Sequence, residues 1–357
     1  MSIASYVQAI PKVELHVHLE GAIQPSTVLE LASRNHIELP FQDEKALRKS
    51  FIYSDFDHFI ETFIMVTRCL KTVVDYELIV YEFGAEMARQ NVRYAEVTVT
   101  PSTHYRLGIP HATWFTGLQR GRSRVQSDFG ITINWIFNIV RKWADPTATV
   151  PMADYVTQVA IEGKNDGVVA LGLAGSEAGA HAEPFAHWFD HARAEGLHSV
   201  PHAGEMSGPE SVWGAIHTLG AERIAHGVRA IEDPKLIEYL VNQRLPLDIT
   251  PTSNIQLGVY PDYASHPLPR LYGAGAIVTI STDDPPLFNI TLSDEYALLA
   301  TRFGLDINSI DQIVLNGVRS SFLPEMQRRD LEMACQVELA RLKALHFNDH
   351  DTHPGSE

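Results

Sequence analysis

Cysteine is scarce in this chain, since Cys69 and Cys335 are the two that occur among 357 residues. A scaffold held together by several disulfides is therefore excluded, and a chain of this length can bury a large core without any. One disulfide between the two thiols is the alternative, but we expect both to be free and buried.

Long apolar runs are also missing. No stretch approaches the roughly 18 uninterrupted apolar residues of a membrane-spanning helix. The first residues, MSIASYVQAIPKVELHVHLEG, lack the basic segment and the apolar run of a signal peptide. We therefore expect a soluble, cytoplasmic protein with no membrane partner.

Basic residues are too few for a protein that binds polyanions. The chain has 28 Lys and Arg against 44 Asp and Glu, which gives a formal net charge of −16. Nucleic-acid binders usually carry a basic surplus that meets the phosphates. Because the field of this chain repels polyanions, we expect a small-molecule substrate and no nucleic-acid partner.

Eight short segments rich in β-branched and apolar residues alternate with helix-length spacers, and most run into Gly, Pro, Ser, Thr or Asp. In chain order they are Lys12–Glu20, Val92–Thr100, Ile131–Val140, Val168–Leu173, His198–His202, Arg223–His226, Pro246–Thr250 and Ala276–Ser281. This α/β alternation predicts a parallel sheet, and eight strands close a (β/α)8 TIM barrel. A doubly wound open sheet is the alternative, but no glycine-rich phosphate loop follows the first segment.

The chain is expected to form a single barrel domain over residues 1–345, followed by a polar tail at 346–357. Residues 21–91 form an insertion after the first strand, with helical patterns at Pro25–Arg34 and Phe56–Leu70. Such an insertion would lie at the C-terminal mouth of the barrel and could serve as a lid. Extra C-terminal helices are predicted over Ile310–Phe322 and Arg328–Leu345.

Histidine and aspartate stand at the ends of several predicted strands, where TIM barrels carry their active sites. His16 and His18 are two apart, on one face of the first strand, while His202 ends the fifth and Asp283 follows the eighth. Singly, each has a structural explanation, because the chain holds 17 histidines and the Asp283-Asp284 pair could cap a helix. Together at one rim, three nitrogens and one carboxylate suit zinc, with one position left for water.

One zinc ion per chain is expected rather than two. Binuclear barrel hydrolases need a bridging group, usually a carbamylated lysine at the end of the fourth strand. Here that strand runs into Leu173–Glu177, and the nearest lysine, Lys164, precedes it. A metal-dependent amide or phosphoester hydrolase with two metals is the competing class.

Six motifs resemble those of the adenosine and adenine deaminases of the amidohydrolase superfamily, in the same order. They are KVELHVHLEGA from Lys12, LAGSE from Leu173, HAGE from His202, RIAHG from Arg223, STDDP from Ser281 and SSFLPE from Ser320. The resemblance extends from Pro11 to about Glu325. It implies four metal ligands, which are His16, His18, His202 and Asp283.

The resemblance also implies roles around the purine. Glu205 would protonate N1, His226 would orient and deprotonate the water, and Asp284 would hydrogen-bond N7. The backbone N–H of Gly175 would reach N3, and Glu20 would meet the ribose beside His18. This fits the chemistry, because attack at C6 needs an acid and a base, each of which typically contributes about 10²–10⁴-fold. The cysteine-ligated zinc deaminases use a Cys-x-x-Cys pair, which this chain lacks.

Departures from the family pattern leave the substrate open. Glu20 stands where mammalian-type adenosine deaminases carry the aspartate that contacts the ribose 5′-hydroxyl, whereas Leu173–Gly175 looks nucleoside-type. We expect a 6-aminopurine nucleoside, either adenosine or a 5′-modified adenosine. The alternatives are 6-aminodeoxyfutalosine, adenine, or the substrate of another mononuclear metal amidohydrolase.

Three further features have structural and functional interpretations. Thr250 replaces a cysteine often seen in the family, which we interpret as a packing change. Glu177 is as well explained by a structural role as by a place at the rim of the site. Aromatic residues in the insertion are more often core, but one of three could cover the purine: Phe56, Phe59 and Phe63.

Overall fold

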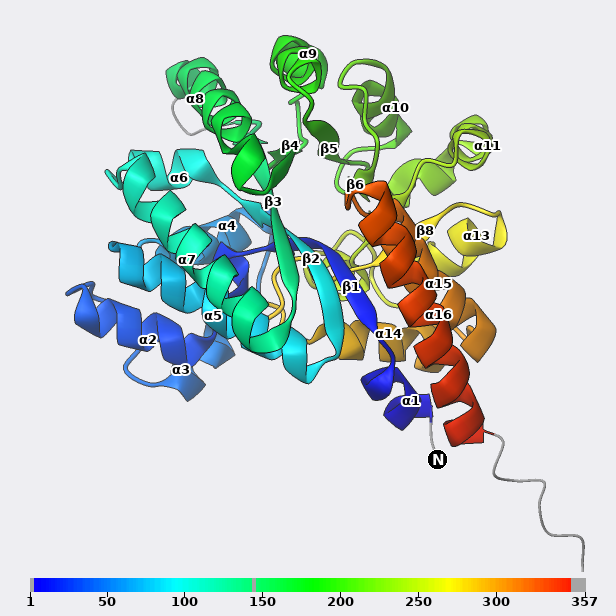
Figure 1. Ribbon diagram of the computed structural model, residues 1–357. Coiled ribbons are helices and arrows are strands. Elements are labelled where there is room, and N and C mark those ends of the chain that lie inside the picture. Colours follow the sequence, from blue (N-terminus) through cyan, green and yellow to red (C-terminus); the bar gives the residue numbers. More distant parts are fainter. Residues whose placement is uncertain (1–2, 143–145, 348–357) are drawn as a thin grey trace, which may run out of the picture.

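The computed structural model describes residues 3–142 and 146–347, and their strands form the predicted (β/α)8 TIM barrel (Figure 1). The eight strands pair in parallel in the order β1-β2-β3-β4-β5-β6-β7-β8. The ring closes where Val17 bridges Asp283 in parallel, next to a backbone hydrogen bond of 2.8 Å from His18 N–H to the Asp283 carbonyl. All C-terminal strand ends therefore meet at one rim.

The strands lie where the sequence predicted them, with shorter bounds toward the C-terminal half. They are β1 (Lys12–His18), β2 (Val92–Val99), β3 (Thr132–Val140), β4 (Val168–Ala174), β5 (His198–Ala203), β6 (Ile224–His226), β7 (Leu247–Ile249) and β8 (Val278–Ile280). Their side chains are almost all buried, as expected for a sheet covered by helices on one side and filled with side chains on the other.

The connecting helices surround the barrel (Figure 1). They are α6 (Pro101–Arg106), α7 (His111–Phe129), α8 (Thr149–Glu162), α9 (Ala186–Ala194), α10 (Pro209–His217), α11 (Pro234–Gln243), α12 (Pro251–Gln256), α13 (Leu268–Gly273), α14 (Leu292–Thr301) and α15 (Ile307–Ser320). Several begin with proline at the first helical position, where its missing N–H costs no hydrogen bond.

The insertion after β1 begins with a short 3-10 turn, η1 (Glu20–Ala22), and continues as four helices: α2 (Pro25–Arg34), α3 (Glu44–Ser50), α4 (Phe56–Thr67) and α5 (Val73–Arg89). Two contacts join the insertion to the loop after β8. The Tyr53 hydroxyl donates to the Leu287 carbonyl at 3.0 Å, and the Phe59 ring stacks on Phe288 with centroids 5.4 Å apart. The insertion therefore lies over the barrel mouth, as predicted.

The two chain ends pack together on the outside of the barrel. The N-terminal α1 (Ile3–Ala9) contacts the long final helix α16 (Glu325–Phe347), which also packs on α15. Helix α16 continues through Phe347, the second residue of the predicted tail at 346–357; residues 348–357 lie outside the described residues. Both Cys69 and Cys335 are buried and free, as expected.

A charged network fills the barrel interior below the rim. Arg223, Glu96 and Asp248 all have fully buried side chains, and the guanidinium pairs with both carboxylates at 2.6 and 2.5 Å. The ring of Phe322 covers the guanidinium at 4.6 Å, and Ser320 accepts a hydrogen bond from it at 2.9 Å. The SSFLPE motif thus serves as part of the barrel floor.

In the described ranges, no helix is both long and apolar enough to cross a membrane.

Candidate active site

Four predicted metal ligands converge at the rim of the barrel. The Nε2 atom of His202 lies 3.1 Å from Nε2 of His16 and 3.3 Å from Nε2 of His18. Asp283 Oδ1 lies 3.4 Å from His16 Nε2 and 3.3 Å from His18 Nε2. Tetrahedral zinc with ligands at about 2.1 Å separates them by about 3.4 Å, so the observed spacing fits one shared ion.

Hydrogen bonds alone do not explain this cluster. Each imidazole Nε2 can donate or accept one hydrogen bond, yet those of His16 and His18 each face both Asp283 Oδ1 and His202 Nε2 in a buried space. Burial and the neighbouring histidines hold the pKa of His202 well below its usual range. A neutral imidazole has a free lone pair, so the donor set suits a cation that all four atoms contact together.

Further contacts orient the ligands from behind. His16 Nδ1 lies 3.3 Å from the Asp248 carbonyl, and the Ser253 hydroxyl donates to Asp283 Oδ2 at 2.6 Å. Such contacts fix ring orientation and ligand basicity in metal sites. The helix-cap explanation of the aspartate pair is wrong, because Thr291 caps α14.

Glu205 and His226 lie beside the cluster, with Glu205 Oε2 at 3.6 Å from His226 Nε2. Burial, followed by the charges of Asp283 and Glu177, raises the pKa of Glu205 well above its usual range. Burial and the nearby His16 lower the pKa of His226 to about 3. A carboxyl whose protonated form is favoured and a neutral imidazole therefore face one space, which is the arrangement of an acid and a base.

Thr250 has a contact that the sequence interpretation missed. Its hydroxyl lies 3.0 Å from His226 Nδ1, so the replacement of cysteine is more than a packing change. A threonine hydroxyl that accepts the Nδ1 proton leaves Nε2 free as a base. The sequence offered one sign of this role, because Thr250 directly follows β7 and so lies at the rim that carries the other site residues.

A cavity next to the cluster joins the barrel rim to the insertion. Its polar side is formed by His18, His202, Glu205, His226, Asp283 and Asp284. Its apolar side comes mainly from α4, whose contributing side chains are Phe56, Phe59, Ile60, Phe63 and Ile64. The insertion thus supplies a cover for the site, and all three candidate phenylalanines line it.

Gly175 and Asp284 both line this cavity, and glycine is needed at Gly175 itself and at Gly21, next to Asp284. Gly175 has φ of +89° and exposes its backbone to the cavity. Burial and the adjacent Asp283 raise the pKa of Asp284 well above its usual range. A Cβ on Gly21 would meet Asp284 Oδ1 at 1.6 Å, so glycine is needed there for Asp284 to take its position.

Glu20 differs from the other predicted substrate-binding residues, because it is not among those that line the cavity. Its carboxylate is buried, accepts a 2.9 Å hydrogen bond from Thr100 N–H and lies 3.1 Å from His104 Nε2. His104 is held in turn by the Tyr76 hydroxyl at 2.9 Å. One Glu20 oxygen is therefore committed to a protein partner, whereas Oε2 has none among the described residues.

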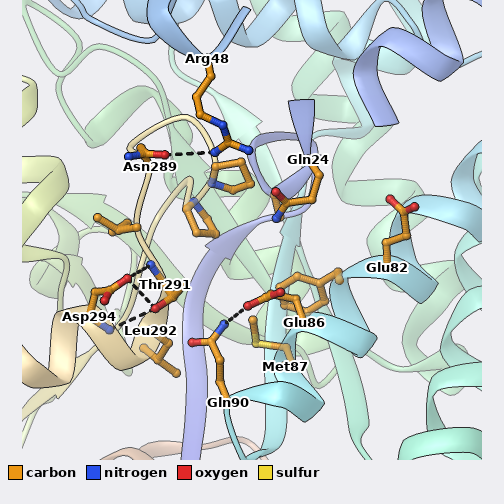
Figure 2. A pocket seen from close by; sticks show the side chains of 15 residues that line it. Gln24, Arg48, Glu82, Glu86, Met87, Gln90, Asn289, Thr291, Leu292 and Asp294 are labelled. Carbon is orange, nitrogen blue, oxygen red and sulfur yellow. Dashed lines mark hydrogen bonds between the residues drawn. The ribbon is translucent and has the colours of Figure 1, made fainter. Parts of the chain in front are cut away.

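A second cavity of about 200 Å³ lies between α5 and the loop after β8 (Figure 2). Six of its polar side chains pair with each other: Arg48 donates to Asn289, Gln90 donates to Glu86, and Thr291 donates to Asp294. None of its lining residues is a histidine or cysteine. The cavity of about 110 Å³ at the metal cluster is therefore the candidate active site.

Comparisons with known proteins agree with this geometry. The model of the family described as adenosine deaminase matches residues 11–336. The aminodeoxyfutalosine deaminase of Streptomyces coelicolor is 39% identical over 89% of this chain and 82% of its own length. The adenine deaminase of Cupriavidus necator is 33% identical over 92% of both chains.

A solved structure has the same fold and contains a metal. It is an amidohydrolase from Burkholderia ambifaria with bound zinc, which superposes with a TM-score of 0.88 at 27% identity, over 98% of this chain and 96% of the other. The match over residues 11–336 includes every predicted site residue. The chain is thus an enzyme of the adenosine deaminase family, a family of metal-dependent hydrolytic deaminases in the amidohydrolase superfamily.

Proposed function

We propose that this enzyme hydrolyses the 6-amino group of a purine nucleoside, giving the 6-oxo product and ammonia, with one zinc ion per chain. The observation that carries the proposal is the set of contacts of 3.1–3.4 Å that join His16, His18, His202 and Asp283, with Glu205 and His226 beside them. These four residues would hold the ion, and a solved relative with this fold contains zinc. When bound, the ion polarises a water molecule for attack at neutral pH.

The chain's own residues supply the proton transfers. Glu205, whose protonated form burial favours, donates to N1 of the purine and makes C6 more electrophilic. Neutral His226 takes a proton from the attacking water through Nε2, while Thr250 holds its Nδ1 side. Asp284 binds N7, and the Gly175 N–H reaches N3, so the ring is fixed at three positions.

Two observations favour a nucleoside with a modified 5′ position. Ala174 and Gly175 line the cavity with little or no side chain, so this part of its wall, like the apolar face of α4, offers no polar side chain to a 5′-hydroxyl. Glu20, the expected partner of a 5′-hydroxyl, does not line the cavity, and its Oε1 is bound to His104 and Thr100. Two relatives at 39% identity are aminodeoxyfutalosine deaminases, so we propose 6-aminodeoxyfutalosine as the preferred substrate.

Adenine is the second candidate, because several relatives at 33% identity are adenine deaminases and a free base needs no partner for a 5′-hydroxyl. The test is a panel of 6-aminodeoxyfutalosine, adenosine and adenine, followed by purine absorbance and ammonia release. We expect kcat/KM to be highest for 6-aminodeoxyfutalosine. A preference for adenine would replace the proposed substrate, and no turnover of any of the three would refute the proposed function.

Metal removal should abolish turnover and lower the unfolding temperature. Because the ion binds the folded site and not the unfolded chain, its loss removes the stabilisation that ligand binding provides. We expect metal analysis to find close to one zinc per chain, and a chelator followed by added zinc to remove and restore activity. Two metals per chain at full activity would contradict the single-ion site.

A further inference from the structure

Glu177 holds the loop that carries Glu205 through an unusual number of hydrogen bonds. Its side chain is buried, with 4% exposure. Oε1 accepts from Gly204 N–H at 2.8 Å, and Oε2 accepts from the N–H groups of Glu205, Met206 and Ser207 at 2.9, 2.6 and 3.0 Å. The Ser211 hydroxyl donates to Oε1 at 2.5 Å. One carboxylate therefore binds four consecutive backbone amides.

Four amides that point to one place form an anion-binding nest. Hydrogen bonds from N–H groups to a carboxylate are stronger than those to a neutral acceptor, so the charge of Glu177 holds the loop in its curved form. Gly204 makes the curve possible with φ of +65°, and a Cβ there would meet Val212 Cγ2 at 2.4 Å. The nest is filled from within the chain.

Arg141 holds the same loop through other contacts. Its guanidinium donates to the carbonyl of His202 and, at 2.9 Å, to that of Ala180. It also lies close enough to interact electrostatically with Glu177 and Glu205. Two side chains thus fix the backbone from His202 to Ser207. Glu177 binds the amides of residues 204–207, and Arg141 binds the carbonyl of His202.

We propose that Glu177 is a positioning residue, which sets the place of the Glu205 carboxyl against the purine ring by fixing the backbone of residues 204–207. This inference rests on the proposed function, in which Glu205 donates a proton to the substrate. A displacement of about 1 Å at a reacting group can lower the rate by roughly 10²-fold. The binding of the ground-state substrate depends less on that placement.

Glu177→Gln tests the proposal with little change in volume. The amide oxygen can replace Oε2, but the amide nitrogen then faces Gly204 N–H, and the negative charge is lost. We expect kcat to fall by about 10²-fold with a much smaller change in KM. Glu177→Asp, which keeps the charge, should recover part of the lost kcat. Zinc content should stay at the parent's value.

Asp75→Asn is the matched control. Asp75 is also fully buried and accepts backbone N–H bonds, from Lys71 at 3.0 Å and Thr72 at 2.8 Å, but it lies at the start of α5. Asp75→Asn should have a lower unfolding temperature than the parent and the same kcat. If Glu177→Gln lowers the unfolding temperature in the same way and keeps kcat within about twofold, Glu177 is only structural and the proposal is overturned.

Amide hydrogen exchange provides a readout that does not depend on turnover. The amides of Gly204, Glu205, Met206 and Ser207 should exchange faster in Glu177→Gln than in the parent and in Asp75→Asn. If the parent turns over no aminopurine, the proposed function fails, and exchange alone then decides whether Glu177 holds the loop. Unchanged exchange at these four amides would refute the positioning role.

Discussion

Glu205→Gln should lower kcat/KM by about 10²–10⁴-fold while metal content and unfolding temperature remain close to those of the parent. Burial, then the charges of Asp283 and Glu177, raises the pKa of this carboxyl well above its usual range, which favours its protonated form. Glutamine has nearly the same shape but has no acidic proton to give. The change therefore removes the proton donor and leaves the cavity intact.

The pH profile gives an independent test of the same role. An acid must be protonated to act, so parent activity should fall as pH rises through the raised pKa of Glu205, and this alkaline limb should be missing in the residual activity of Glu205→Gln. Glu222→Gln is the control, because Glu222 pairs with His198 and is 43% exposed. Turnover by Glu205→Gln at the parent's level would exclude Glu205 as the acid.

Arg223→Met should destabilise the fold by about 3–5 kcal/mol, the largest stability effect that we expect from a single change. The guanidinium is fully buried and pairs with Asp248 at 2.5 Å and with Glu96 at 2.6 Å. Without it, two carboxylates remain in the barrel interior with no cation. They keep only neutral partners, including the hydroxyls of Thr279 and Tyr94.

Denaturant unfolding at two pH values measures this prediction. Burial already raises the pKa of Asp248, and the Arg223 guanidinium opposes this rise, so loss of the cation raises the folded-state pKa of Asp248 further. The folded variant therefore holds a proton on Asp248 at a pH at which the unfolded chain has lost it. The loss in free energy of unfolding, relative to the parent, should therefore be larger at pH 7 than at pH 5. The control Arg93→Met removes an exposed pair with Glu338 and should cost less than about 1 kcal/mol. Equal losses in both variants would show that the buried network adds no special stability.

The strand positions could be predicted from the sequence, but their ends could not. The predicted segment at Arg223–His226 shortens to Ile224–His226, and that at Ala276–Ser281 shortens to Val278–Ile280. Apolar and β-branched residues show where a strand lies, whereas its end depends on the local backbone. At the rim, His226 and Asp283 take φ of +67° and +65°, which removes them from regular strand geometry and aims their side chains at the site.

The sequence by itself determined the alternation of strands and helices, the residue types at the rim and the convergence of the four residues proposed as metal ligands. These follow from local patterning and from the rule that all parallel strands of a barrel end at one rim. Only the tertiary structure decided which buried groups pair: Thr250 with His226, Glu20 with His104, and Glu177 with four backbone amides. The partners are far apart in the chain, and each buried polar group takes whichever partner the closed barrel brings within reach, which no local pattern encodes.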